Sequence, residues 1–224
     1  MINKNLLNLF NVCKRYDKNI IFKNVNMKIK LGEHISIIGA SGSGKSTFLN
    51  LLSGLENASS GKVLYQCVNW AKMKEKHKNN IRKKNLGFIY QYHYLMPELT
   101  VLENIAMPLI INEINPKTAC CIAYRLLKKI NLSSIYNMKP FQLSVGIKHR
   151  VSFARAIVNK PAFILADEPT KSLDIKNSLI AIKYLKYVSL KYGSTLIIVT
   201  HNRLIANLMK KRYIIKNGRI NALP

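Results

Sequence analysis

The stretch Gly39-Ala40-Ser41-Gly42-Ser43-Gly44-Lys45-Ser46 decides how this chain folds, because it fits the phosphate-binding loop pattern G-x-x-x-x-G-K-[ST]. An apolar run at residues 34–38 precedes it and predicts a strand, and an apolar stretch at residues 48–52 predicts a helix. Glycines let the backbone bend around a phosphate, so that amide N–H groups and the helix N-terminus converge on the anion. The sequence therefore predicts a nucleotide-binding protein, rather than a Gly/Ser turn that happens to precede a lysine.

The loop also predicts how a nucleotide and Mg²⁺ are held. Lys45 places a positive charge at the phosphates, and Ser46 supplies the hydroxyl that phosphate-binding-loop proteins use to hold Mg²⁺. We expect nucleotide contacts from nine consecutive residues: Gly39, Ala40, Ser41, Gly42, Ser43, Gly44, Lys45, Ser46 and Thr47.

The composition predicts a cytosolic protein. The chain has 224 residues, 48% of them hydrophobic, enough for one sizeable α/β domain or two small ones. No apolar run reaches the roughly 20 residues that span a bilayer, and residues 1–5 lead into an amphipathic stretch rather than a signal peptide. Four cysteines show neither C-x-x-C spacing nor histidines at ligand spacing, so we interpret them as reduced and structural.

The net charge of +26 allows three interpretations. Lysine and arginine neutralise phosphates, so a charge this large can indicate nucleic acid or anionic lipid headgroups. The lysines are nevertheless spread along the chain, in short clusters such as residues 72–78, 82–84 and 210–212, and they accompany many Asn and Ile residues. We therefore favour solvated lysines that follow codon composition, and we predict no specific nucleic-acid partner.

The rest of the chain predicts one domain with a helical insertion. Strands are expected at residues 19–22, 25–29, 63–65 and 86–90, and helical periodicity runs from 101 to about 159 with turn signals at Pro116 and Pro140. Continuous apolar runs at 162–166 and 194–199, with a helix at 176–192 between them, are typical of central strands in a parallel sheet. We expect a single domain over 1–224, with a core at about 1–91 and 160–224 and a helical subdomain at about 92–159.

A second chemical site is predicted where the run at 162–166 ends. Asp167 suits the carboxylate that orders Mg²⁺ and its waters, and Glu168 suits the group that orients or deprotonates the attacking water. Alone, the pair could simply begin a turn before Pro169; beside the phosphate-binding loop, the catalytic interpretation is preferred.

Several short motifs, in order, resemble those of ATP-binding cassette (ABC) ATPases, and the resemblance covers nearly the whole chain. They are Gln91 after a strand, Leu143-Ser144-Val145-Gly146 opening a helix before Arg150, Asp167-Glu168-Pro169-Thr170, Ser172-Leu173-Asp174, and Val199-Thr200-His201. The resemblance implies an α/β fold of the P-loop NTPase type, with a RecA-like core, an antiparallel β subdomain and an inserted helical subdomain.

The resemblance also implies residue roles. Gln91 would reach Mg²⁺ and link the site to a membrane partner, and His201 would be the switch histidine near the γ-phosphate. Tyr16 would stack on adenine, unless it is only a surface tyrosine of a strand. Such domains work as head-to-tail pairs, in which Ser144 and Gly146 of one copy cap the nucleotide of the other. A lone copy would then be nearly inactive.

Residues 86–109 narrow the resemblance to the ATPase subunits of lipoprotein-releasing transporters. Those machines extract lipid-anchored proteins from the outer leaflet of a Gram-negative inner membrane, so lipoprotein would be an indirect partner. This region would grip integral-membrane subunits, which places the chain peripherally on the cytoplasmic face. Macrolide-exporter-type and cell-division-type ATPases share the motifs but match less well at residues 92–95.

Three residues depart from the family pattern. Val145 replaces the first glycine of the L-S-G-G-[EQ] signature, Ile147 replaces the acid or amide, and Lys171 stands where glycine is common. We expect Val145 to restrict a turn where close backbone approach is wanted, which would affect hydrolysis more than binding.

Three functional classes follow from these motifs. A transport ATPase is preferred over a soluble ABC ATPase acting on nucleic acid or ribosomes, which usually has two cassettes or a long coiled-coil insertion. The altered signature keeps a third class open, a weakly hydrolysing structural cassette.

Overall fold

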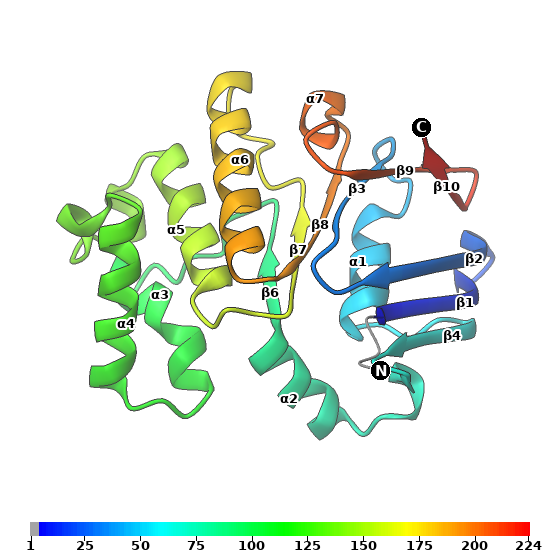
Figure 1. The fold of residues 1–224 in the computed structure, drawn as a ribbon, viewed down its shortest axis with the longest axis horizontal. Coiled ribbons are helices and arrows are strands. Elements are labelled where there is room, and N and C mark those ends of the chain that lie inside the picture. Colours follow the sequence, from blue (N-terminus) through cyan, green and yellow to red (C-terminus); the bar gives the residue numbers. More distant parts are fainter. Residues whose placement is uncertain (1–4) are drawn as a thin grey trace.

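The computed structural model describes residues 5–224 and contains two sheets (Figure 1). Residues 1–4, where the sequence predicts the start of an amphipathic stretch, lie outside the described residues. The larger sheet has the order β10-β9-β3-β8-β7-β6, and all its pairings are parallel except β9 with β10. Its strands are β3 (His34–Ile38), β6 (Leu86–Ile89), β7 (Phe163–Asp167), β8 (Thr195–Thr200), β9 (Lys211–Lys216) and β10 (Arg219–Leu223).

The larger sheet confirms the predicted parallel core. The strands expected at 162–166 and 194–199 are β7 and β8, each displaced by one residue. Every residue of β8 is buried, because helices cover both faces of the parallel strands. In parallel neighbours the carboxyl ends of the strands meet at one edge, so the ends of β3 and β7 lie together there.

The smaller sheet is antiparallel and has the order β2-β1-β4-β5. Its strands are β1 (Asn5–Tyr16), β2 (Asn19–Lys30), β4 (Ser60–Tyr65) and β5 (Val68–Asn69). The two strands expected at 19–22 and 25–29 form the single strand β2, which passes through Asn24 at a φ of 52°. This sheet is the antiparallel β subdomain that the resemblance implies.

Helix α1 (Lys45–Ser53) packs between the two sheets and continues the phosphate-binding loop. It begins after Gly44, whose φ of 95° is in the left-handed region that favours glycine, and it ends at Gly54 with a φ of 67°. Phe48 of α1 meets Phe22 of β2 edge to face, with ring centroids 5.8 Å apart. Packing against the antiparallel sheet therefore helps to fix the first turns of α1.

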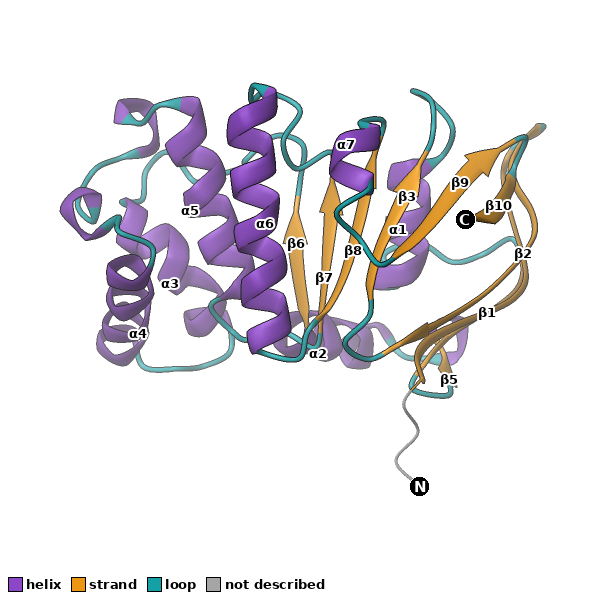
Figure 2. Ribbon diagram, turned by 45° about the horizontal axis from the view of Figure 1, so that its top comes forward, coloured by secondary structure: helices purple, strands orange, loops and turns teal. Residues whose placement is uncertain are grey.

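The opposite face of the parallel strands is covered by α6 (Ile175–Lys191) and α7 (Arg203–Ala206), as Figure 2 shows. Helix α6 begins at Asp174, whose carboxylate accepts a hydrogen bond from the backbone N–H of Asn177. This helix confirms the one expected at 176–192. No helix within the described part of the chain is long and apolar enough to cross a membrane.

The helices between β6 and β7 have a hydrophobic cluster of their own, at the end of the molecule away from the antiparallel sheet (Figure 1). These helices are α3 (Val101–Ile111), α4 (Pro116–Lys129) and α5 (Val145–Ile157), with short 3₁₀ helices at Ser133–Ile135 and Pro140–Gln142. The region between β5 and β6 contains a 3₁₀ helix at Trp70–Lys72 and α2 (Glu75–Asn85), which the sequence did not predict. In α2 only Lys78 is buried, so the sequence has no apolar periodicity from which this helix could be predicted.

Candidate functional site

A cavity of 520 Å³ opens where β3, β6 and β7 end. It brings together most of the residues that the sequence singles out, from the phosphate-binding loop, the loop after β6, the end of β7 and the residue after β8. The lining residues are Ile21, Ser41, Gly42, Gly44, Lys45, Ser46, Thr47, Gln91, Asp167, Glu168, Lys171 and His201.

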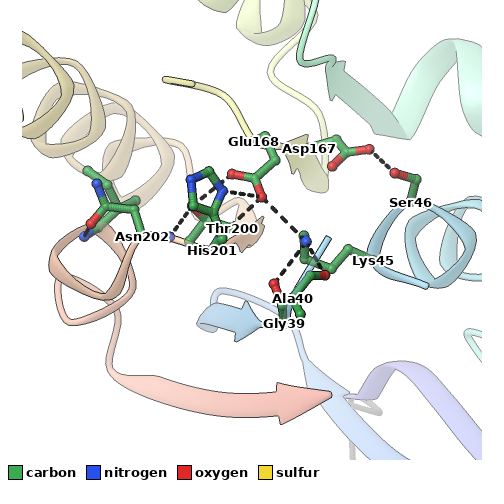
Figure 3. A network of polar contacts seen from close by, with 10 residues as sticks. Gly39, Ala40, Lys45, Ser46, Asp167, Glu168, Thr200, His201 and Asn202 are labelled. Atoms are coloured by element: carbon green, nitrogen blue, oxygen red, sulfur yellow. Dashed lines mark hydrogen bonds and ion pairs between the residues drawn. The ribbon is translucent and has the colours of Figure 1, made fainter. Parts of the chain in front are cut away.

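Lys45 is buried and lines this cavity, and Figure 3 shows its ammonium group between Glu168 and the carbonyl oxygens of Gly39 and Ala40. Its ammonium group donates hydrogen bonds of 2.9 Å to the carbonyl oxygens of Gly39 and Ala40, and lies 3.5 Å from Oε1 of Glu168. The nearby Oγ of Ser43 is buried without a hydrogen-bond partner among the described residues. A buried cation, an unpaired hydroxyl and the start of α1 together fit a phosphate group.

Glu168 is held in one orientation by groups from the end of β8. Its Oε2 accepts a 3.0 Å hydrogen bond from the Thr200 hydroxyl. Its Oε1 accepts hydrogen bonds from the backbone N–H of His201 at 3.0 Å and from the His201 ring at 2.9 Å. The backbone of Glu168 has a φ of 43°, a conformation that costs on the order of 1 to 3 kcal/mol in a residue other than glycine. In this conformation the buried carboxylate faces Lys45.

Asp167, at the end of β7, is half-buried and accepts a hydrogen bond from the hydroxyl of Ser46, the second residue of α1. Burial raises the pKa of the Asp167 carboxyl, and the hydrogen bond from Ser46 partly opposes this. The oxygens of Ser46, Asp167 and Gln91 line the same cavity and are the ligand type that Mg²⁺ prefers. The donor set therefore fits a magnesium ion beside a phosphate.

Replacing Asp167 by asparagine is expected to stabilise the nucleotide-free chain at neutral pH. Because the pKa of Asp167 is raised by folding, the unfolded chain loses this proton first as pH rises, and folding stability falls over that interval. The variant escapes this penalty, so we expect a higher Tm than that of the wild type at pH 7.

Thermal unfolding at pH 7 and at acidic pH measures this effect, since the gain disappears where the wild-type carboxyl is protonated in both states. Asp174→Asn is the matched control, because hydrogen bonds from the Asn177 backbone and side chain lower the pKa of that exposed carboxyl. The control is expected not to gain stability. A lower Tm of the Asp167→Asn chain than of the wild type at pH 7 would contradict the raised pKa of Asp167 in the folded chain.

Six predicted nucleotide contacts are not among the residues that line this cavity: Gly39, Ala40 and Ser43 of the loop itself, and Tyr16, Ser144 and Gly146. Tyr16 ends β1, is 44% exposed, and donates a hydrogen bond to Glu56 while Lys14 lies 4.6 Å from its ring centroid. Ser144 and Gly146 line a different cavity, of 740 Å³, between α5 and α6. Within one chain the phosphate-binding loop and these signature residues are therefore separate.

The expectation that Val145 restricts a turn is wrong. Val145 is the first residue of α5 and is not among the described residues with positive φ. Ser144 is extended, with φ −63° and ψ 158°, and acts as the N-cap residue. A Cβ at Gly146 would meet nothing closer than Leu173 at 3.8 Å. The signature is a regular helix start, so a β-branched residue fits there without strain.

The sequence assigns no site role to three contributors: Thr200, Ile21 and Lys171. Thr200 belongs to the motif Val199-Thr200-His201 without a predicted role, yet its hydroxyl donates a hydrogen bond to Glu168. Ile21 lines the cavity from β2, and its Cγ2 would lie 2.5 Å from a Cβ at Gly44. Thr200 could have been found from the sequence, because it lies directly before His201 at the end of a buried strand. No local signal announces Ile21.

Comparisons with known proteins agree with this geometry. The family model described as ABC transporter matches residues 22–171. The chain is 42% identical, over 98% of each protein, to the lipoprotein-releasing system ATP-binding protein LolD of Wigglesworthia glossinidia brevipalpis.

Solved structures show the same fold. The ATP-binding cassette MJ0796, in a dimeric post-hydrolysis state bound to ADP and Pi, superposes with a TM-score of 0.87 and 35% identity, over 98% of this chain and 99% of that one. The protein cbiO1 of Clostridium perfringens, part of the ABC transporter complex cbiONQ, gives a TM-score of 0.88 and 26% identity, over 98% and 88%. With a fold, a phosphate-binding loop and a full-length relative in agreement, the chain belongs to the ABC transporter family as one of its ATP-binding cassettes.

Proposed function

We propose that this ABC ATPase drives the release of lipoproteins from the inner membrane toward the outer membrane. The main support for ATP hydrolysis is one cavity, which is lined by Lys45, Ser46, Asp167, Glu168 and His201. The full-length similarity to the LolD protein supports the lipoprotein substrate. The chain itself would contact the nucleotide, and lipoprotein would be handled by membrane subunits.

In this proposal the polar residues of the cavity divide into groups that bind phosphate, bind the metal ion and activate water. The loop amides and Lys45 hold the phosphates of ATP, while Ser46, Asp167 and Gln91 hold Mg²⁺. The metal ion, when bound, neutralises charge that develops on the transferred phosphoryl group. Glu168 accepts a proton from the attacking water, and its hydrogen bonds from Thr200 and His201 fix the orientation of the carboxylate.

We further propose that a second copy of the chain completes the site. Ser144 is exposed, and its side chain caps no backbone N–H of α5. The Ser144 hydroxyl is thus available to nucleotide held by the phosphate-binding loop of the other copy, and Gly146 follows on the same helix turn. The dimeric structures of the related MJ0796 cassette support this pairing.

Tyr16 would stack on the adenine.

Integral-membrane permease subunits are the proposed partners, on the cytoplasmic face of the inner membrane. Directly after Gln91, three large side chains are exposed: Tyr92 by 65%, Tyr94 by 63% and Met96 by 39%. Such a cluster beside a magnesium ligand suits a surface that transmits movement to a partner. The helical cluster of α3, α4 and α5 would form a subdomain at about 92–159, inserted in a core at about 1–91 and 160–224.

The test is ATP-dependent release of a lipoprotein from proteoliposomes that contain this chain and its membrane subunits. Release to an acceptor protein is expected with ATP and absent with a non-hydrolysable analogue. ATP hydrolysis without release would refute lipoprotein transport and favour a macrolide-exporter-type or cell-division-type role. Absence of both would favour a structural cassette.

Binding to nucleic acid is expected to be weak and nonspecific despite the charge of +26. Scattered lysines release counterions along any duplex, so affinity falls steeply with salt. Fluorescence anisotropy with a generic DNA duplex at rising salt measures this. A sub-micromolar Kd at about 150 mM salt, with fixed stoichiometry, would contradict the prediction.

A further inference from the structure

His149 lies inside α5 and is 1% exposed, in the turn of helix that follows Gly146. None of the site roles above uses it. Its ring nevertheless contacts two loops that carry proposed catalytic groups, one from each side.

The first contact is with the loop that follows Glu168. Nε2 of His149 lies 2.7 Å from the Ser172 hydroxyl. Burial and, to a lesser extent, the nearby His93 ring lower the pKa of His149 to about 4, although a hydrogen bond to the backbone of Pro169 partly opposes them. The ring is therefore neutral at pH 7, with one donor and one acceptor nitrogen, as contacts with a carbonyl and a hydroxyl require.

The second contact is with the loop that follows Gln91. The rings of His149 and His93 meet edge to face, with centroids 4.1 Å apart. One helical turn and a half further along α5, Arg155 donates 2.7 Å hydrogen bonds to the carbonyl oxygens of His93 and Tyr94. Helix α5 thus holds the Gln91 loop at two points.

We propose that His149 is a positioning residue for ATP hydrolysis, which holds the Gln91 loop and the Glu168 loop on the helix that begins at Ser144. This inference rests on the proposed roles of Gln91 and Glu168. When Ser144 and Gly146 engage nucleotide on a second copy, displacement of α5 is passed to both loops through one buried ring. The catalytic carboxylate and the magnesium ligand then move together rather than independently.

The experiment measures kcat and KM for ATP in the complex with the membrane subunits. Removing the ring by His149→Ala is expected to lower kcat about 10- to 100-fold, the usual cost of misplacing reacting groups by about an ångström. KM and the Kd for ATP of the isolated subunit are expected to stay unchanged, since Lys45 and its loop are untouched. His149→Gln, whose amide keeps a donor and an acceptor, is expected to recover most of the turnover.

Two further variants keep the test decisive. Ser172→Ala removes only the hydroxyl that meets His149 and is expected to lower kcat in the same direction, whether or not His149→Ala folds. His77→Ala is the matched control, because His77 is exposed on α2.

Wild-type kcat in both His149→Ala and Ser172→Ala, or a raised KM with unchanged kcat, would overturn the positioning role alone. If His149→Ala does not fold, wild-type kcat in Ser172→Ala overturns it, and a reduced kcat supports it. A wild-type complex without any turnover would overturn the proposed ATPase, and this inference with it.

Discussion

Replacing Glu168 by glutamine is expected to lower the ATP turnover of the assembled complex by about 10²- to 10⁴-fold, the usual contribution of a positioned general base. The amide keeps the size of the side chain and one oxygen that accepts from Thr200 or His201, but it cannot take a proton. ATP affinity is expected to change little, because Lys45 keeps its hydrogen bonds to Gly39 and Ala40. Steady-state phosphate release and equilibrium ATP binding measure the two effects separately.

Glu33→Gln is the matched control for this experiment. Glu33 is also ion-paired, with Lys211 at 2.6 Å, but it precedes β3 and so lies at the sheet edge opposite the site. The control is expected to keep wild-type turnover. A Glu168→Gln complex with turnover within about twofold of wild type, under 0.5 kcal/mol in barrier, would mean that another group activates the water.

Replacing Lys45 by alanine is expected to weaken ATP binding itself. The ammonium group is buried, and removing one partner of a buried, hydrogen-bonded charge pair costs about 2 to 5 kcal/mol, or about 30- to 5,000-fold in Kd. Titration of the isolated subunit with a fluorescent ATP analogue measures the loss.

Lys211→Ala serves as the control, since it removes an ion-paired lysine that is not among the residues lining the cavity. Its Kd is expected to match the wild type. If Lys45→Ala bound ATP as tightly as the control, the phosphates would have to lie away from the loop at residues 39–46.

The sequence predicted those parts of the structure that short-range patterns determine. The loop at 39–46 and the strands β7 and β8 follow from glycine spacing and from continuous apolar runs, which parallel strands need because both faces are covered. Helix α2 was missed because its stability does not come from an apolar face. Its buried Lys78 instead pairs with Glu75 at 2.8 Å and reaches Asn57.

The candidate site was predicted as a set of residues but not as a geometry. Glu168 has a left-handed backbone conformation, and nothing in the sequence before Pro169 indicates it. The hydrogen bond from Thr200 to Glu168 links the ends of two different strands, so it cannot be predicted from local sequence. For the same reason the contact between His93 and His149 was not foreseen, because the two rings come from segments far apart in the chain. The helix expected to open at residues 143–146 is confirmed, and the error was to expect a restricted turn at Val145, which is already the first residue of that helix.

The most direct test of the central claim is to mix two inactive variants in the assembled complex and measure ATP turnover. Lys45→Ala disables the phosphate-binding loop, and Ser144→Arg blocks the signature without disturbing the fold, since Ser144 is exposed and makes no capping hydrogen bond with its side chain. In a head-to-tail pair, the mixed complex keeps one site with an intact loop from one copy and an intact signature from the other. We predict turnover in the mixture well above that of either variant alone. A mixture as inactive as its two components, or a Ser144→Arg complex that is fully active, would contradict a site shared between two copies of this chain.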